Sequence, residues 1–279
     1  MSSESSSPEP SSSKSSSPTD SLLVEARGAV RTIVLNRPDQ RNALPPADWL
    51  RLAEVLGRIE ADREARAIVI RGAGGRAFSS GYDINALREL DDEGIVLSTP
   101  RDPFEVALAA LAAHPLPTIA MVNGFAIGGG CTLAAGCDIR IASASARFGM
   151  PPAKLGLVYS PNELRPFVQL LGVGRTKLLF YSGQIISAQK AYELGLADDV
   201  VADDALESVT YALADEIAAN APLSVRGTKR ILRAMQGPAA PPDTAGELDA
   251  LIGAVNTSAD LAEGKRAFLE KRPPSFRGE

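Results

Sequence analysis

The sequence predicts an α/β fold in which helices cover the sheets and further helices complete the C-terminal part. Short apolar runs alternate with segments of helical periodicity up to about residue 200, and after Val201 only helical periodicity remains. Apolar residues make up 45% of the 279 residues and aromatic residues only 5%. Aliphatic side chains are therefore expected to fill one large core.

Composition divides the chain into three expected parts. Residues 1–20 contain eleven serines and three prolines, too little apolar surface to offset the entropy cost of ordering, so they are expected to form a disordered tail. The strand-containing core is expected over residues 21–204. A helical C-terminal subdomain is expected over residues 205–279.

Turn signals and apolar periodicity place the elements in order. Two strands, over residues 22–26 and 29–35, are expected to flank a tight turn at Arg27-Gly28. A helix follows Pro45-Pro46, and a short apolar strand covers residues 67–70. Further along, we expect helices from about Asp83, near 104–113, and over 206–219, 223–235, 244–255 and 258–270, a strand over 118–122, and a loop between two helices at residues 172–177.

Charge and residue counts exclude several classes of protein. The net charge of −5 argues against a nucleic-acid binder. A triad or a metal site would rest on the single histidine, His114, which nothing nearby supports, so His114 is interpreted as structural and no metal is expected. Cys131 and Cys137 are too few for a disulfide framework and are interpreted as small buried residues in a cytoplasmic protein.

No membrane association is expected. The N-terminus lacks the charged start and apolar run of a secretory signal. The uncharged stretch from Pro115 to Cys137 is long enough to span a bilayer, but it contains Asn123 and five glycines. A buried strand leading into a buried helix accounts for it better.

Two glycine-containing loops are the candidate site. The first, Ala77 to Ile84, joins a strand to a helix, and the second, Asn123 to Cys131, does the same. Such loops present unpaired backbone N–H groups at a helix N-terminus, which favours an anion or a developing oxyanion. Neither loop has the spacing of a phosphate-binding or dinucleotide fingerprint. Tight packing of helix on strand is the alternative explanation for the glycines.

Several ordered motifs resemble those of the crotonase, or enoyl-CoA hydratase/isomerase, superfamily. The likeness runs from about residue 22 to the C-terminus. Its motifs are Leu35-Asn36-Arg37-Pro38 through Asn42-Ala43-Leu44, both glycine loops, Cys137-Asp138-Ile139-Arg140, Ser187-Ala188-Gln189-Lys190-Ala191, and Ala267-Phe268-Leu269-Glu270-Lys271-Arg272-Pro273.

The resemblance implies a crotonase-type α/β spiral of repeated strand–strand–helix units, with C-terminal helices that build homotrimers or homohexamers. It also implies an oxyanion hole formed by the N–H groups of Tyr82 and Gly129, which cradle a thioester oxygen. Fixed dipoles aimed at a developing enolate oxygen contribute about 3–4 kcal/mol per donor. The substrate would be an acyl-CoA thioester, with coenzyme A as part of the substrate and no permanently bound cofactor.

The same resemblance implies how coenzyme A is held. The backbone from Ser80 through Gly81, Tyr82 and Asp83 to Ile84 would hold the adenine, Arg41 would meet the phosphates, and Ala43, two residues further on, would also contact coenzyme A. Phe268 and Lys271 would close over the nucleotide. For Arg41 and Lys271, a solvated surface charge is the alternative.

The chain departs from the hydratases of this superfamily at their two catalytic glutamates. Thr132 and Pro152 occupy these positions, so hydration by the two-glutamate mechanism is not expected. The run Pro151 to Tyr159 is similar to that of bacterial methylmalonyl-CoA decarboxylases, which also lack the pair and have a tyrosine at the position of Tyr159. Those enzymes have a histidine where this chain has Tyr82.

Decarboxylation of a malonyl-type acyl-CoA is therefore the first hypothesis. Loss of carbon dioxide generates the enolate without a base, and the Tyr159 phenol would orient the leaving carboxylate. A second hypothesis is isomerisation, atypical hydration or C–C cleavage with Glu163 as the base, although Glu163 is also placed to cap a helix. Thr132 would contact the acyl group or be structural. A non-catalytic acyl-CoA-binding protein is the third hypothesis.

Overall fold

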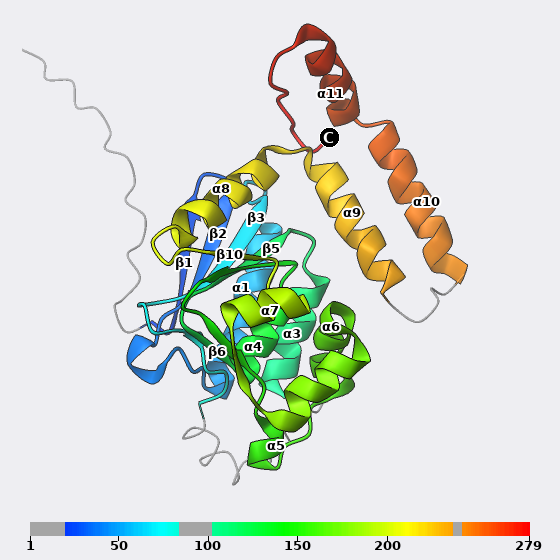
Figure 1. Cartoon of the computed structure of the whole chain (residues 1–279). Coiled ribbons are helices and arrows are strands. Elements are labelled where there is room, and N and C mark those ends of the chain that lie inside the picture. The colour runs from blue at the N-terminus through cyan, green and yellow to red at the C-terminus, as the bar shows by residue number, and fades with distance from the viewer. Residues whose placement is uncertain (1–19, 84–101, 237–241) are drawn as a thin grey trace, which may run out of the picture.

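The computed structural model describes residues 20–83, 102–236 and 242–279. Its largest sheet has the order β1-β2-β3-β5-β7-β10 (Figure 1), and only β1 runs antiparallel to its neighbour. The strands are β1 (Leu22–Arg27), β2 (Val30–Leu35), β3 (Ala67–Gly72), β5 (Thr118–Val122), β7 (Ile139–Ser143) and β10 (Asp199–Val201).

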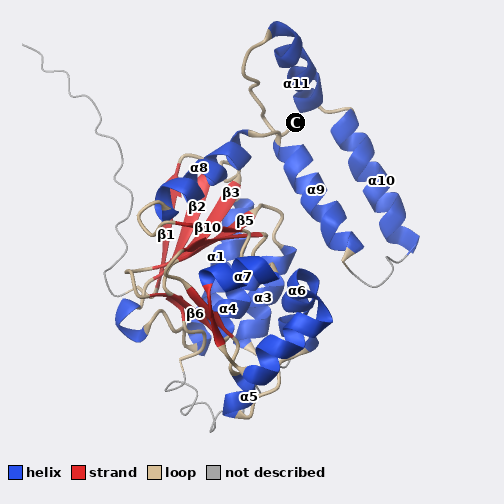
Figure 2. Ribbon diagram, in the orientation of Figure 1, coloured by secondary structure: helices blue, strands red, loops and turns tan. Residues whose placement is uncertain are grey.

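A second, smaller sheet lies beside the first (Figure 2). It has the order β4-β6-β8-β9, in which β4, β6 and β8 are parallel and β9 is antiparallel to β8. The strands are β4 (Ala77–Ser79), β6 (Phe125–Ile127), β8 (Arg147–Gly149) and β9 (Ile185–Ser187). The α/β class expected from the sequence is confirmed.

The central strands β2, β3, β5 and β7 are buried over nearly their whole length, which explains why they are mostly apolar, whereas β1 is exposed over most of its length. Ile68 and Ile70 of β3 face a large core under α1 (Pro46–Ala61) and α3 (Pro103–Ala113). The alternate residue Val69 faces the opposite core, under α8 (Leu206–Ala219). Although helical, α8 therefore packs as part of the α/β core. It covers one face of the sheet, with α1 and α3 on the other (Figure 1).

The other helices follow from capping and turn signals. They are α4 (Gly129–Gly136), α5 (Pro152–Leu155), α6 (Pro161–Ser182) and α7 (Ala188–Leu194). The expected loop between two helices at residues 172–177 is shortened to a single residue. Gly172 alone leaves helical geometry, with φ 71° and ψ 164°, and this kink separates two helical segments of α6. A single glycine tolerates this positive φ, so one residue makes the kink.

Three C-terminal helices project from the core (Figure 1). They are α9 (Pro222–Met235), α10 (Pro242–Asn256) and α11 (Ala259–Glu270), close to the ranges expected from periodicity. The Lys229 ammonium joins α9 to the core through the Asp138 carboxylate at 2.6 Å and the Leu116 carbonyl at 2.7 Å.

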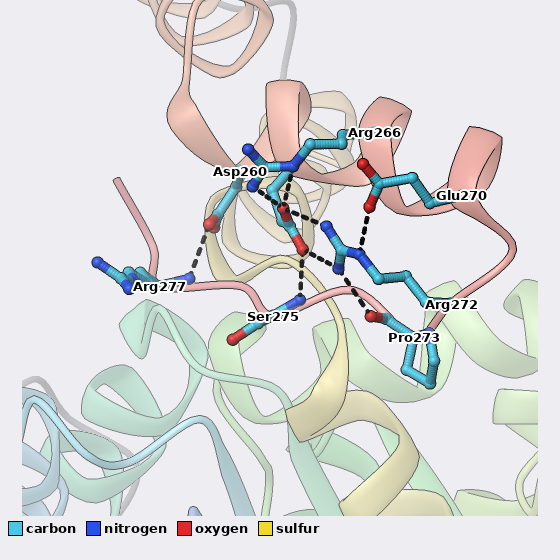
Figure 3. A network of polar contacts seen from close by, with 8 residues as sticks. Asp260, Arg266, Glu270, Arg272, Pro273, Ser275 and Arg277 are labelled. Carbon is cyan, nitrogen blue, oxygen red and sulfur yellow. Dashed lines mark hydrogen bonds and ion pairs between the residues drawn. The ribbon is translucent and has the colours of Figure 1, made fainter.

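A polar network folds the last residues back on α11 (Figure 3). The Asp260 carboxylate accepts hydrogen bonds from the backbone N–H groups of Arg277, at 2.7 Å, and Gly278, at 2.8 Å. Glu263 pairs with Arg272 and Arg266, and these cations hold the pKa of its carboxyl far below the usual range. These hydrogen bonds and ion pairs hold the backbone of residues 275–278 against α11.

The segment between β2 and α1 is fastened to the loop after β4. Asn42 is fully buried at φ 55°. Its amide donates to the carbonyls of Ala73, at 3.0 Å, and Ala77, at 2.7 Å, and its side-chain oxygen accepts from the Arg37 N–H at 2.9 Å. Its backbone carbonyl accepts from the Ser79 hydroxyl at 2.8 Å. One side chain thus fixes three backbone segments.

Asn42→Ala is expected to lower the free energy of unfolding by about 3 kcal/mol or more, because each buried polar group left unpaired costs about 1–3 kcal/mol. Urea titration followed by circular dichroism measures the change. Asn220→Ala, at an exposed position, is the control and should stay within about 0.5 kcal/mol of the parent. Equal changes in the two variants would contradict the role given to Asn42.

Candidate active site

The two glycine loops meet at one edge of the smaller sheet. β4 and β6 are parallel neighbours, so the chain leaves both strands at the same edge. The contact is between backbones: a Cβ placed on Gly81 would lie 2.6 Å from the Gly129 nitrogen and 2.9 Å from its Cα. A side chain at position 81 would separate the loops, and φ 83° at Gly81 also favours glycine.

This contact brings two backbone donors together. Leu44 donates to the Gly81 carbonyl and accepts from the Asp83 N–H, so the Tyr82 N–H between them takes no part in that bridge. Gly129 is the first residue of α4, where an N–H has no intrahelical acceptor. Within the described residues, neither N–H donates a hydrogen bond. The geometry suits an oxygen that carries negative charge.

The side chain of Tyr82 is fixed at the N-terminus of α3. Its phenol hydrogen-bonds the Asp102 carboxylate and accepts from the Phe104 N–H at 3.1 Å. Its ring lies among those of Trp49, with centroids 5.9 Å apart, and Phe104, at 5.7 Å. Burial, followed by the hydrogen bond to Asp102, raises the pKa of Tyr82 far above its usual value, so the phenol stays protonated.

Tyr159 lies beside Gly128 of the second loop. Its hydroxyl is 3.7 Å from the position that a Cβ on Gly128 would take, and its ring packs edge-on against Phe180. Burial, followed by the negative charge of Glu163, raises the pKa of Tyr159, and the Thr132 side chain partly opposes this. The phenol is therefore a hydrogen-bond donor throughout the physiological pH range.

Thr132 and Glu163 have structural contacts. The fully buried Thr132 hydroxyl donates to the Gly128 carbonyl one turn earlier, at 3.2 Å. The Glu163 carboxylate accepts from the Ser160 N–H at 2.6 Å, while the Ser160 hydroxyl accepts from the Glu163 N–H at 3.2 Å. This reciprocal pair is a capping box at the start of α6, the structural reading that the sequence offered for Glu163.

Two buried carboxylates near the site were not predicted from the sequence. Asp102 and Glu105, from the first turn of α3, are both buried, and Glu105 contacts the Ser160 hydroxyl and the Asn162 amide. The pair Asp102-Pro103 signals the start of a helix, because aspartate is a good N-cap and proline fits the first turn. Nothing in that signal indicates that the first turn faces the glycine loops.

The residues expected on the coenzyme A side form one group near the first loop. Arg41 is exposed, and its carbonyl accepts from the Ser80 N–H at 3.0 Å. The Ala43 carbonyl and the Asp83 carboxylate both accept from the Arg37 guanidinium, at 2.6 and 2.9 Å. Ile84 lies outside the described residues.

Phe268 and Lys271 are not in that group. Phe268 is on α11 and is 83% exposed, and Lys271 ends the helix in the left-handed conformation. Figure 1 places α11 well away from α4 and β6, so these residues do not meet the glycine loops within one chain.

The remaining expectations concern His114, a metal site and membrane-spanning helices. His114 is buried, its ring accepts from the Leu116 N–H at 3.1 Å, and burial lowers its pKa. Within residues 20–83, 102–236 and 242–279 there is no cluster of histidine, cysteine or acidic residues that could hold a metal. No helix in that part of the chain has both the length and the apolarity to cross a membrane.

The two sheets and their paired glycine loops define the class of protein as crotonase-fold. The chain belongs to the enoyl-CoA hydratase/isomerase family, whose sequence profile matches residues 25–279. It is 34% identical to a short-chain-enoyl-CoA hydratase of Clostridium acetobutylicum, over 91% of this chain and 96% of that one.

Two further comparisons agree. A 2,3-dehydroadipyl-CoA hydratase of Escherichia coli is 34% identical, over 92% of this chain and 98% of that one. A crystal structure of an enoyl-CoA hydratase/carnithine racemase from Magnetospirillum magneticum superposes with a TM-score of 0.86 at 36% identity, covering 94% of this chain and 97% of that one. The resemblance stated from the motifs is thus confirmed.

Both cysteine thiols are expected to resist modification in the folded protein. Cys131 and Cys137 are free and buried, and burial raises the pKa of each to about 12. A raised thiol pKa leaves the unreactive neutral form at pH 8, and exclusion of reagent adds to the protection. Titration with a disulfide reagent should therefore count no thiol in native protein and both after unfolding in guanidinium. Rapid native labelling would contradict this burial.

Proposed function

We propose that this protein is an acyl-CoA decarboxylase that acts on a malonyl-type thioester. The observation that carries the proposal is the pairing of two backbone N–H groups, on Tyr82 and Gly129, that have no acceptor among the described residues, with the half-buried phenol of Tyr159 beside Gly128. The glutamate positions of the hydratases hold Thr132 and Pro152, neither of which can act as a base at neutral pH.

The proposed reaction needs no base from the protein. The bond between the α-carbon and the carboxylate carbon breaks, carbon dioxide leaves, and the electron pair moves into the thioester to form an enolate. The Tyr82 and Gly129 N–H groups stabilise the enolate oxygen, each by about 3–4 kcal/mol. A proton from water then reaches the α-carbon and completes the saturated acyl-CoA.

Tyr159 is proposed to orient the substrate carboxylate. Decarboxylation is fastest when the breaking bond is perpendicular to the thioester plane, because its electrons then enter the π system. A neutral phenol donates a hydrogen bond to a carboxylate without a salt bridge that would hold the charge in place. The raised pKa of Tyr159 supports this role, since the donor proton is retained.

Hydration or isomerisation of an enoyl-CoA is the second candidate. The similar proteins from Clostridium acetobutylicum and Escherichia coli are named as hydratases. The buried carboxylates Asp102, Glu105 and Glu163 lie around the two tyrosines and offer a possible base outside the usual positions. Their contacts with Tyr82, Ser160 and backbone N–H groups support structural roles instead.

Coenzyme A is proposed to lie along the first loop, with its phosphates near Arg41 and its adenine against residues 80–84. Phe268 and Lys271 would contribute from a neighbouring copy, since α11 lies far from the loops of its own chain. A homotrimer or homohexamer is proposed for the same reason. Large apolar side chains exposed on the projecting helices support it: Leu232, Met235, Ile252, Phe268 and Leu269.

Purified protein is expected to convert methylmalonyl-CoA to propionyl-CoA, as measured by mass spectrometry. Tyr159→Phe should lower kcat by about 10- to 100-fold, because a hydrogen bond to a charged group contributes about 1.5–3 kcal/mol. Tyr181→Phe, at an exposed position near the end of α6, is the matched control and should keep full activity. Hydration of crotonyl-CoA in place of decarboxylation would reject the proposal.

Glu163→Gln separates the two candidate reactions. Glutamine preserves a capping box, so α6 and the fold should be retained. Decarboxylation should stay within about threefold of the parent, whereas a base at position 163 would make activity fall about 100-fold or more. The measurement is kcat on methylmalonyl-CoA and crotonyl-CoA in parallel, and a loss of that size would favour the second candidate. Tight binding without any product would indicate a non-catalytic binding protein.

A further inference from the structure

We propose that Asp102 and Phe104, in the first turn of α3, are positioning residues that set the direction and spacing of the two oxyanion donors. This inference rests on the proposed role of the Tyr82 and Gly129 N–H groups. It adds a third element, α3, to a site that would otherwise consist of the two loops alone.

The first observation is that the Tyr82 hydroxyl makes two hydrogen bonds, one as a donor and one as an acceptor. It donates to the Asp102 carboxylate and accepts from the Phe104 N–H. The same carboxylate accepts from the Phe104 N–H at 2.9 Å, so the phenol joins an existing N-cap. The side chain of Tyr82 is thereby fixed to a rigid helix end.

The second observation is that the Phe104 ring touches both loops. Its centroid is 5.7 Å from that of Tyr82, and its edge carbons lie 3.4 and 3.5 Å from the position of a Cβ on Gly129. Trp49 also packs against the Phe104 ring, with ring centroids 4.6 Å apart. The buried Phe104 ring therefore packs beside both Tyr82 and Gly129. A shorter side chain at position 104 would allow the two loops to shift.

The backbone contacts on either side of Tyr82 explain why anchoring its side chain affects the direction of its N–H. The Ser79 hydroxyl fixes the Gly81 N–H at 3.0 Å, and the Leu44 bridge fixes the Gly81 carbonyl and the Asp83 N–H. Among residues 20–83, 102–236 and 242–279 the Tyr82 N–H has no such contact, and its direction follows from the torsions around Gly81. Because the phenol is anchored, rotation of the Tyr82 residue is restrained from the side-chain end.

The alternative is that Asp102 only caps α3, and a set of variants separates the two roles. Asp102→Asn can cap the helix and accept from the phenol. Asp102→Ser can cap the helix but is too short to reach the phenol. Tyr82→Phe keeps the ring and the Tyr82 N–H but removes the phenol. Melting temperatures show whether each variant is folded.

The readout is polarisation of a bound thioester carbonyl. Acetyl-CoA labelled with ¹³C at the carbonyl is bound to each protein, and its C=O stretch is measured by isotope-edited infrared spectroscopy, with affinity from calorimetry. The parent and Asp102→Asn should lower the stretching frequency equally. Tyr82→Phe and Asp102→Ser should return it toward the free value with Kd changed by less than about threefold, since positioning affects the carbonyl more than the nucleotide.

Activity gives a second readout. The kcat on methylmalonyl-CoA should fall by about tenfold or more in Tyr82→Phe and Asp102→Ser, because small displacements of a site carry large rate penalties. The double variant should be no worse than either single variant, since Asp102 acts through Tyr82.

The outcomes are distinct. A parent-like frequency in folded Tyr82→Phe and Asp102→Ser overturns the inference and leaves the proposed function intact. No frequency shift, or no binding, in the parent protein rejects the oxyanion hole, and the inference falls with it. Additive losses in the double variant show that Asp102 does not act through Tyr82 and also overturn it.

Discussion

The direct backbone contact between Gly81 and Gly129 is the constraint on which the site depends. The loops can approach this closely because position 81 carries no Cβ: a Cβ there would lie 2.6 Å from the Gly129 nitrogen, closer than van der Waals contact allows. The parallel pairing of β4 and β6 brings both loops to the same edge of the smaller sheet. Two backbone donors, on Tyr82 and Gly129, thereby become neighbours.

The surrounding structure fixes this contact from two sides. Asn42 and Ser79 hold the first loop against the segment before α1 through buried hydrogen bonds. On the other side, the first turn of α3 meets Tyr82 and Gly129 through Asp102 and Phe104. Donors that are held rigid before substrate arrives need no reorganisation during the reaction, which is the basis of electrostatic preorganisation.

The family and the acid/base groups lead to different expectations about the reaction. Similar proteins are named as hydratases, yet this chain has Thr132 and Pro152 at the two positions where the resemblance implies catalytic glutamates. The carboxylates that do lie near the tyrosines are each engaged by a helix N-terminus or a hydroxyl. A reaction in which the substrate supplies the electron pair fits these residues without requiring any carboxylate to leave its contacts.

Periodicity, turn residues and motif spacing are local signals, and they were enough to predict the α/β class, most helix and strand ranges, the glycine loops and the absence of glutamate at positions 132 and 152. The tertiary structure was needed to show that the break in α6 is confined to Gly172, that α8 packs on the core, and that Glu163 caps α6. It alone brought Asp102, Glu105 and Phe104 to the site and left Phe268 far from it. Contacts between α3 and a loop some twenty residues away depend on how helices pack on the sheets, and no local pattern encodes that packing.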